Sequence, residues 1–215
     1  MRVSCRCGQL TDGLTVQLAD SVLDTGLKDV PALYELWGCL SVIQTVIDAA
    51  LEQGLQVVAQ GLVRPVPGCL LVALSPGGGS AVALAHADGR RIDLTQQRPF
   101  TDRGLWQSVS FTQRPDLVLE CTAPGTRPRL MIFDPKYKRD DGNGPQKADI
   151  DKMHAYRDAI IHADGGRIVR HATILYPGPT RCFGPGLSAI SALPGEDAAL
   201  ADGIRRLLAD HLFGA

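Results

Sequence analysis

The chain has 215 residues, enough for one domain with its own hydrophobic core. Apolar residues make up 45% and charged residues 21%, a balance that excludes an intrinsically disordered or fibrous protein. The formal net charge of −1 excludes a uniformly basic nucleic-acid-binding protein, so any contact with a polyanion must come from a local patch. We therefore expect residues 1–215 to form a single domain.

The N-terminal region contains no apolar run of the signal-peptide kind, and we expect no membrane-spanning stretch further along. This pattern indicates a cytoplasmic protein without membrane contact. The six cysteines are scattered, which in a reducing compartment is typical of buried residues or idle thiols. Cys5 and Cys7 are an exception, but they supply at most half of a zinc site because no second Cys or His pair lies at a matching distance.

The clearest predicted helix covers residues 31–53. Pro31 suits its first turn and Gly54 its end. Its apolar residues recur at intervals of three and four: Leu33, Leu36, Trp37, Leu40, Ile43, Ile47 and Leu51. This spacing places them along one broad face, which we expect to pack against the core.

Residues 55–103 are predicted to be a β-rich elaboration. Strand-like runs cover 56–63, 68–74 and 81–86, with breaks rich in proline at 65–67 and in glycine at 77–79. Such breaks indicate turns between the strands of a meander. The triple glycine lacks the lysine and the hydroxyl residue of a phosphate-binding loop, so we interpret it as a turn.

A second β-rich region contains the central hairpin. Strand-like runs cover 106–111, 116–121 and 129–134, and the turn Ala123-Pro124-Gly125-Thr126 lies between the last two. A polar loop at 139–145 follows. Beyond it the sequence predicts a helix over 146–162, a buried strand over 171–176 and a last helix over 196–212.

Two carboxylates and a lysine are expected to meet at the open end of this hairpin. Asp116 begins one strand and Asp134 ends its neighbour, so antiparallel pairing brings them to the same end of the sheet. Period-two alternation points Asp134 and Lys136 to one face and Pro135 to the other.

Carboxylates that meet in this way repel each other unless a cation lies between them, and hard divalent ions such as Mg²⁺ are held so in phosphoryl-transfer sites. Lys136 would supply positive charge for the transition state, or orient the attacking water. The sequence therefore predicts a hydrolase that uses Mg²⁺, for which Mn²⁺ would substitute.

These residues resemble the signature of a known family. Pro115-Asp116, followed by Asp134-x-Lys136, is similar to the motif of the PD-(D/E)XK nuclease superfamily. Further strings resemble the nuclease domain related to the McrC subunit of modification-dependent restriction systems: YELW at 34–37, FDPKYK at 133–138, KMHAYRDAI at 152–160 and LYPG at 175–178. The resemblance spans roughly residues 31–178. It implies an α/β fold, a restriction-endonuclease-like core with a mixed β-sheet flanked by helices.

The resemblance also implies roles for the site residues. Asp116 and Asp134 would be metal ligands, and Lys136 would be the catalytic lysine. Glu35 would approach from the first helix as an additional acidic metal ligand or as a group that orients water. Pro135 departs from the family pattern, in which a small residue is expected at this position.

The surface beside this motif is predicted to bind DNA. The candidates follow the motif directly or lie on the next helix: Tyr137, Lys138, Lys152, Tyr156 and Arg157. Lys152 stands where many relatives have glutamine. His154 is a secondary candidate, because a histidine in such a position is more often a packing or hydrogen-bonding residue than a catalyst.

The implied function is Mg²⁺-dependent endonucleolytic hydrolysis of DNA in restriction or anti-phage defence. A separate motor or recognition subunit is an expected partner, since the sequence has no nucleotide-binding loop, and a homodimer is a further option, since cutting both strands needs two sites. Two alternatives stay open. One is a DNA repair or recombination nuclease that uses the same residues, and the other is a noncatalytic subunit that binds DNA or a partner protein.

Overall fold

The computed structural model describes residues 15–18, 30–66, 69–72, 80–138 and 144–213. The Cys5–Cys7 pair, the triple glycine at 77–79 and most of the polar loop at 139–145 lie outside these residues.

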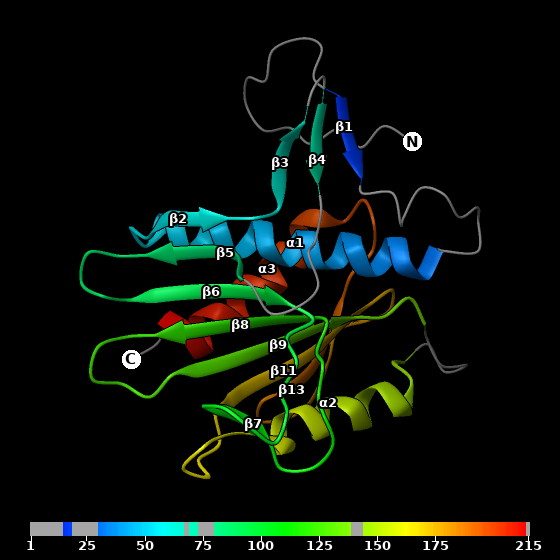
Figure 1. The fold of residues 1–215 in the computed structure, drawn as a ribbon. Helices are drawn as coiled ribbons and strands as arrows, with labels where there is room; N and C mark the ends of the chain where they lie inside the picture. The colour runs from blue at the N-terminus through cyan, green and yellow to red at the C-terminus, as the bar shows by residue number, and fades with distance from the viewer. Residues whose placement is uncertain (1–14, 19–29, 67–68, 73–79, 139–143, 214–215) are drawn as a thin grey trace.

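An eight-stranded mixed sheet organises the fold (Figure 1). Its strand order is β12-β13-β11-β9-β8-β6-β5-β2. The neighbours β9, β11 and β13 are parallel, and all other pairs in this sheet are antiparallel. The strands are β2 (Gln56–Gln60), β5 (Ser80–Ala85), β6 (Arg91–Gln96), β8 (Leu117–Thr122), β9 (Arg129–Pro135), β11 (Val169–Tyr176), β12 (Arg181–Gly184) and β13 (Leu187–Ser191).

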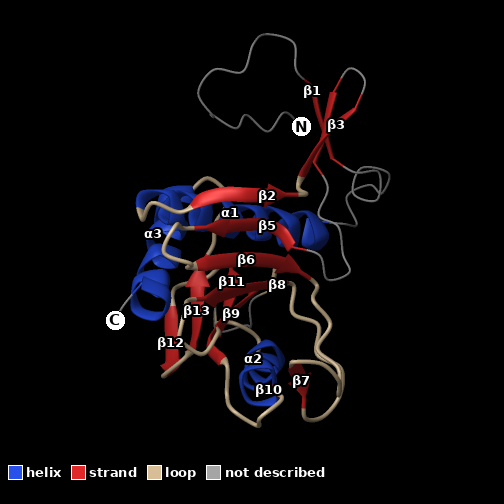
Figure 2. Ribbon diagram, turned by 60° about the vertical axis from the view of Figure 1, so that its left-hand side comes forward, coloured by secondary structure: helices blue, strands red, loops and turns tan. Residues whose placement is uncertain are grey.

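Two smaller sheets accompany the main one. The first joins β1 (Thr15–Leu18), β4 (Cys69–Val72) and β3 (Val63–Val66), and Figures 1 and 2 show it beyond the β2 edge of the main sheet. The second pairs β7 (Trp106–Ser108) with β10 (Ile160–His162).

Three helices cover the two faces of the main sheet (Figure 2). Helices α1 (Val30–Glu52) and α3 (Asp197–Leu208) lie on one face, and α3 continues into a π-helical turn, η2 (Ala209–Phe213). Helix α2 (Lys147–Ala159) lies on the opposite face. This arrangement confirms the predicted α/β class, a mixed sheet flanked by helices that is consistent with a restriction-endonuclease-like core.

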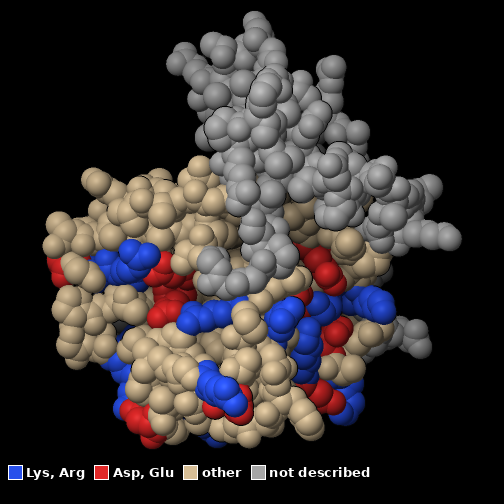
Figure 3. All heavy atoms as spheres, in the orientation of Figure 1, with Lys and Arg blue, Asp and Glu red and all other residues tan. Residues whose placement is uncertain are grey.

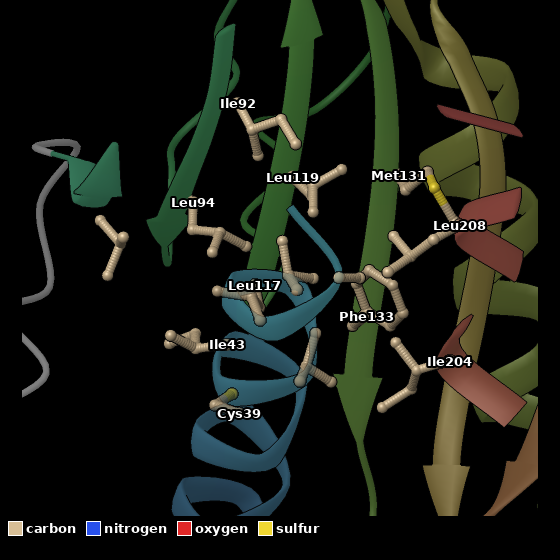
Figure 4. Close-up of a cluster of buried hydrophobic side chains, with 14 of the residues drawn as sticks. Cys39, Ile43, Ile92, Leu94, Leu117, Leu119, Met131, Phe133, Ile204 and Leu208 are labelled. Carbon is tan, nitrogen blue, oxygen red and sulfur yellow. The ribbon is translucent and has the colours of Figure 1, made fainter. Parts of the chain in front are cut away.

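Alternation along β8 and β9 divides the core between the two faces. Leu117, Leu119, Met131 and Phe133 pack with residues of α1 and α3, among them the labelled side chains of Figure 4. The intervening residues Val118, Leu130 and Ile132 pack instead with Met153 and Tyr156 of α2. Each strand therefore has buried side chains on both faces, which explains why both read as continuous apolar runs.

Helix α1 matches the predicted helix at 31–53 within one residue at each end. Among the described helices it has the length and apolar composition that could cross a membrane, contrary to the expectation that no stretch reaches that length. The face of α1 that packs against the sheet carries Val42, Ile43 and Val46, whereas Leu33 and Leu51 of the predicted core face are exposed, so that prediction is wrong for both ends of the helix.

Several predicted boundaries are wrong. The helix predicted over 146–162 ends at Ala159, because Ile160–His162 leave it to pair with β7. The strand predicted over 106–111 stops at Ser108. Strands β1, β3, β6, β12 and β13 were not predicted, and the run predicted as the middle strand of a meander is β4, which pairs in the smaller sheet. Within the predicted elaboration at 55–103, β2, β5 and β6 extend the main sheet.

Candidate active site

The register of β8 and β9 brings Asp116 and Asp134 to the same end of the sheet. Leu117 pairs with Phe133, so Asp116 precedes this pair on one strand and Asp134 follows it on the other. Strand β9 runs on because β11 also pairs with it, and Ile174 lies opposite Asp134. Asp134 is therefore fully buried, at 0% exposure, whereas Asp116 at the strand end keeps 19% of its side chain exposed.

Pro135 is accommodated in β9 without the loss of a sheet hydrogen bond. The Lys136 N–H donates to the carbonyl of Leu175 at 2.8 Å. Successive backbone N–H groups of a strand point to opposite neighbours, so the Pro135 nitrogen faces β8, whose pairing with β9 stops at Leu117. Proline has no backbone N–H, and at this position that absence costs no hydrogen bond because the pairing with β8 has already ended.

The faces of these residues also agree with the predicted alternation. Pro135 points to α1, where a Cβ added at Gly38 would lie 2.7 Å from the Pro135 Cβ atom. Asp134 points to the opposite face, where Lys152 of α2 contacts it. Gly38 thus allows α1 to approach the end of β9 closely, and this approach brings Glu35 of the same helix to the site.

Lys136 links the three predicted acidic residues. Its ammonium group lies 2.8 Å from Asp116 Oδ2 and 3.6 Å from Glu35 Oε1, and it contacts Asp134 Oδ1 directly. On the other side of Asp134, the Lys152 ammonium lies 3.0 Å from Oδ2. The structure therefore brings together all four residues predicted to be catalytic and adds a second lysine.

The pKa values of the two aspartates are shifted in opposite directions. Burial, reinforced by the charge of Asp134, raises the pKa of Asp116 to about 7. Burial also pushes the pKa of Asp134 upward, but Lys136 and Lys152 outweigh it and hold that pKa below its ordinary value. Although burial disfavours charge on Lys136, the neighbouring aspartates raise its pKa above the usual range. The site therefore maintains one firmly ionised carboxylate beside a second that titrates near neutrality.

The residues fit a hard divalent cation. Both buried oxygens of Asp134 lie beside ammonium groups, and the Asp116 carboxyl is also within hydrogen-bonding reach of Asp134. Within the described part of the chain, no three His, Cys, Asp or Glu side chains converge into a complete metal cage. Mg²⁺ does not require such a cage, because it commonly binds through one or two carboxylates together with water and substrate phosphate.

The residues predicted to bind DNA differ in their positions. Lys138 and His154 are exposed, and Tyr137 is half-exposed with its ring centroid 5.4 Å from that of Tyr34. Arg157 is partly buried and donates to the Pro185 carbonyl at 3.0 Å.

Tyr156 is not on a surface, which corrects its predicted role in DNA contact. Its side chain is buried in the core beneath α2, and its hydroxyl donates to the Arg114 carbonyl at 3.1 Å. Arg114 precedes Pro115 and Asp116, so this hydrogen bond anchors the chain just before the first metal-ligand candidate. The apolar spacing of Met153, Tyr156 and Ile160 is the sequence signal that indicates this buried position.

Sequence reasoning missed two contributors to the site, Gly38 and Asp149, and one contact of the predicted residue Lys152. Gly38 sets the approach of α1, and Lys152 contacts Asp134 itself. Asp149, in the first turn of α2, is close enough for the charges of Lys136 and Asp134 to influence it, while burial chiefly raises its pKa. These contacts depend on how helices lie over the sheet, which no local pattern specifies.

A model of the PD-(D/E)XK nuclease superfamily matches residues 32–181, a range that contains all of these site residues. No curated protein and no solved structure matches the chain significantly.

Proposed function

Because this chain belongs to the PD-(D/E)XK nuclease superfamily, we propose that it hydrolyses phosphodiester bonds of DNA with the help of a divalent metal ion. The observation that carries this proposal is the convergence of Asp116, Asp134 and Glu35 on the ammonium group of Lys136. Three acidic groups around one lysine, at the end of two paired strands, supply both the ligands and the fixed charge that phosphoryl transfer needs.

Asp116 and Asp134 would hold the ion, with Glu35 as an additional ligand or an orienting group for water. When bound, Mg²⁺ polarises a phosphate oxygen and lowers the pKa of a coordinated water. Lys136 stays charged across the physiological range, because the neighbouring aspartates raise its pKa. Its ammonium group therefore stabilises the negative charge that develops on the phosphate, or orients the attacking water.

The DNA-binding surface would be local. Figure 3 shows Lys and Arg side chains intermingled with Asp and Glu across the middle of the face viewed, consistent with the net charge of −1. Tyr137, Lys138, Lys152 and Arg157 lie on or beside the motif and on α2, and we propose that these residues contact the phosphate backbone.

We further propose that the protein is a cytoplasmic endonuclease of a restriction or anti-phage system, similar to the McrC-related nuclease domains. The resemblance of the strings around residues 34–37, 133–138 and 152–160 supports this assignment. A motor or recognition subunit would act with it, and a homodimer would provide two sites for double-strand cleavage.

Plasmid and linear DNA should be incubated with the protein and its Lys136→Ala variant, in Mg²⁺, in Mn²⁺ or in chelator. Cleavage is expected only with metal, and the variant should lose activity by about 10²–10³-fold, the usual effect of removing one group that stabilises transition-state charge. Lys147→Ala is the matched control, because Lys147 is exposed and its ion-pair partner is Asp151, which is not one of the site residues. Equal nicking by Lys136→Ala would reject the assignment, and DNA binding without any metal-dependent cleavage would favour a noncatalytic subunit. Preferential cutting of branched or single-stranded DNA would favour a repair nuclease.

A further inference from the structure

The two oxygens of Asp134 are each held by a different lysine. Lys136, from the same strand, contacts Oδ1, and Lys152, from α2 across the sheet face, lies 3.0 Å from Oδ2. Asp134 has no exposed surface, and besides the two lysines the Asp116 carboxyl lies within hydrogen-bonding reach of it. These two ammonium groups therefore provide the compensation that a buried carboxylate requires.

The two lysines are held with unequal strength. Lys136 is 18% exposed and contacts Asp116, Asp134 and Glu35 together. Lys152 is 40% exposed, and Asp134 is its one ion-pair partner among the described residues. Its ammonium also lies 5.3 Å from the ring centroid of Tyr156, which supports the side chain from below. Of the two, Lys152 is the group that can leave Asp134 without breaking a wider network.

A cation that binds Asp134 would share this carboxylate with the Lys152 ammonium, which lies 3.0 Å from Oδ2. Like charges at such a distance repel strongly, and the repulsion is greater in a buried site than in water. A flexible four-carbon side chain with a partly exposed end relieves the repulsion by turning outward. The group that most readily accepts a displaced ammonium beside a nuclease site is a phosphate of the bound DNA.

We propose that Lys152 and the metal ion compete for the negative charge of Asp134, so that metal loading releases Lys152 to bind a phosphate of the DNA. This inference rests on the proposed function. In the metal-free protein Lys152 neutralises Asp134 and stabilises the site; in the loaded protein it becomes a substrate contact. Metal binding and DNA binding are thereby coupled through one side chain, and each strengthens the other.

Metal binding without DNA tests the competition directly. Calorimetric titration with Mn²⁺ at pH 8 should compare the unaltered protein with Lys152→Gln and with Lys147→Gln, which removes the same charge from an exposed position on the same helix. Lys152→Gln should bind Mn²⁺ about fivefold tighter, the upper range for loss of a partly exposed ion pair, and Lys147→Gln should be unchanged. Equal or weaker binding by Lys152→Gln would overturn the competition.

DNA affinity tests the release. DNA affinity should be measured under conditions in which the DNA is not cleaved, with and without Ca²⁺. Addition of Ca²⁺ should strengthen DNA binding by the unaltered protein about five- to tenfold more than DNA binding by Lys152→Gln, because only the unaltered protein frees an ammonium group. Lys152→Arg should keep most of this coupling. An equal metal effect on all variants would refute the release. Neither measurement requires cleavage, so an inactive protein that shows both effects would reject the nuclease proposal and leave the exchange intact.

Discussion

The contact between Gly38 and Pro135 gives a prediction that connects packing to the site. A Cβ added at Gly38 would lie 2.7 Å from Pro135 Cβ and 2.8 Å from Cγ, closer than carbon atoms approach in proteins. The proline ring cannot rotate away, because it is closed on the backbone of a strand that also pairs with β11. In Gly38→Ala, helix α1 must therefore shift away from the end of β9.

Two opposing effects determine the size of the change. Overpacking of this kind costs about 1–3 kcal/mol. Replacement of a helical glycine by alanine returns about 1 kcal/mol through helix propensity. Gly203 of α3 is the matched control, because a Cβ there would meet the Ile190 Cγ2 atom at 3.0 Å, a milder approach to a side-chain methyl group. The propensity gain is the same in both variants and cancels in their difference.

Urea denaturation measures this difference in free energy of unfolding. Gly38→Ala should be less stable than Gly203→Ala by about 1–3 kcal/mol. Its melting temperature should be lower by about 2–4 °C for each kcal/mol in a chain of this size. The shift of α1 should also draw Glu35 from Lys136 and lower the rate of the proposed DNA cleavage, whereas Gly203→Ala should leave that rate unchanged. If Gly38→Ala is as stable as the control, the close approach of α1 to Pro135 is not a constraint on the fold.

The remaining predictions concern the stability of the metal-free protein as pH changes, measured as the urea midpoint between pH 4 and 8. Burial raises the pKa of Asp116 from 3.8 to about 7. The contribution of this residue to the free energy of unfolding is therefore complete below pH 3.8 and is lost as pH rises through 7. Asp116→Asn should remove this loss, and an identical pH profile in the variant would contradict the assignment. Burial, followed by the charge of His211, lowers the pKa of His171 from 6.5 to about 4, so its contribution is present above pH 6.5 and is lost as pH falls through 4. His171→Gln should weaken this acid destabilisation, and unchanged acid sensitivity would show that another group carries it.

Local patterns predicted the elements whose hydrophobic signal is strong. Helix α1 and strands β8, β9 and β11 combine length or continuous apolar character with clear turn residues at their ends. Strand β6 was not predicted because polar residues alternate with its buried Ile92 and Leu94 and leave no continuous apolar run. The end of α2 was placed too late because Ile160 and Ile161 fit the apolar face of a helix as well as they fit a strand. Pairing with β7 decides between the two, and that partner lies more than fifty residues earlier in the chain.

The contacts of the site are also of two kinds, those that local sequence patterns predict and those that depend on tertiary packing. The meeting of Asp116, Asp134 and Lys136 follows from hairpin register and alternation, which are local properties. The contact of Lys152 with Asp134 depends instead on the placement of α2 over the sheet. The burial of Tyr156 depends on the same placement, which explains why an aromatic residue expected to face DNA is part of the core.

The core and the site are specified by one feature, the register of β9. Leu130 and Ile132 lead to Asp134 along the face that α2 covers, whereas Met131 and Phe133 face α1. If β9 slipped by one residue against β8, each of its side chains would point to the opposite face of the sheet. Asp134 would then lie against α1, and Met131 and Phe133 would turn from α1 toward α2. The apolar alternation that excludes this slip also keeps the carboxylate beside its lysines. A well-packed sheet therefore maintains the geometry of the site, and a substitution that shifts the register of β9 should separate Asp134 from Lys136 and Lys152.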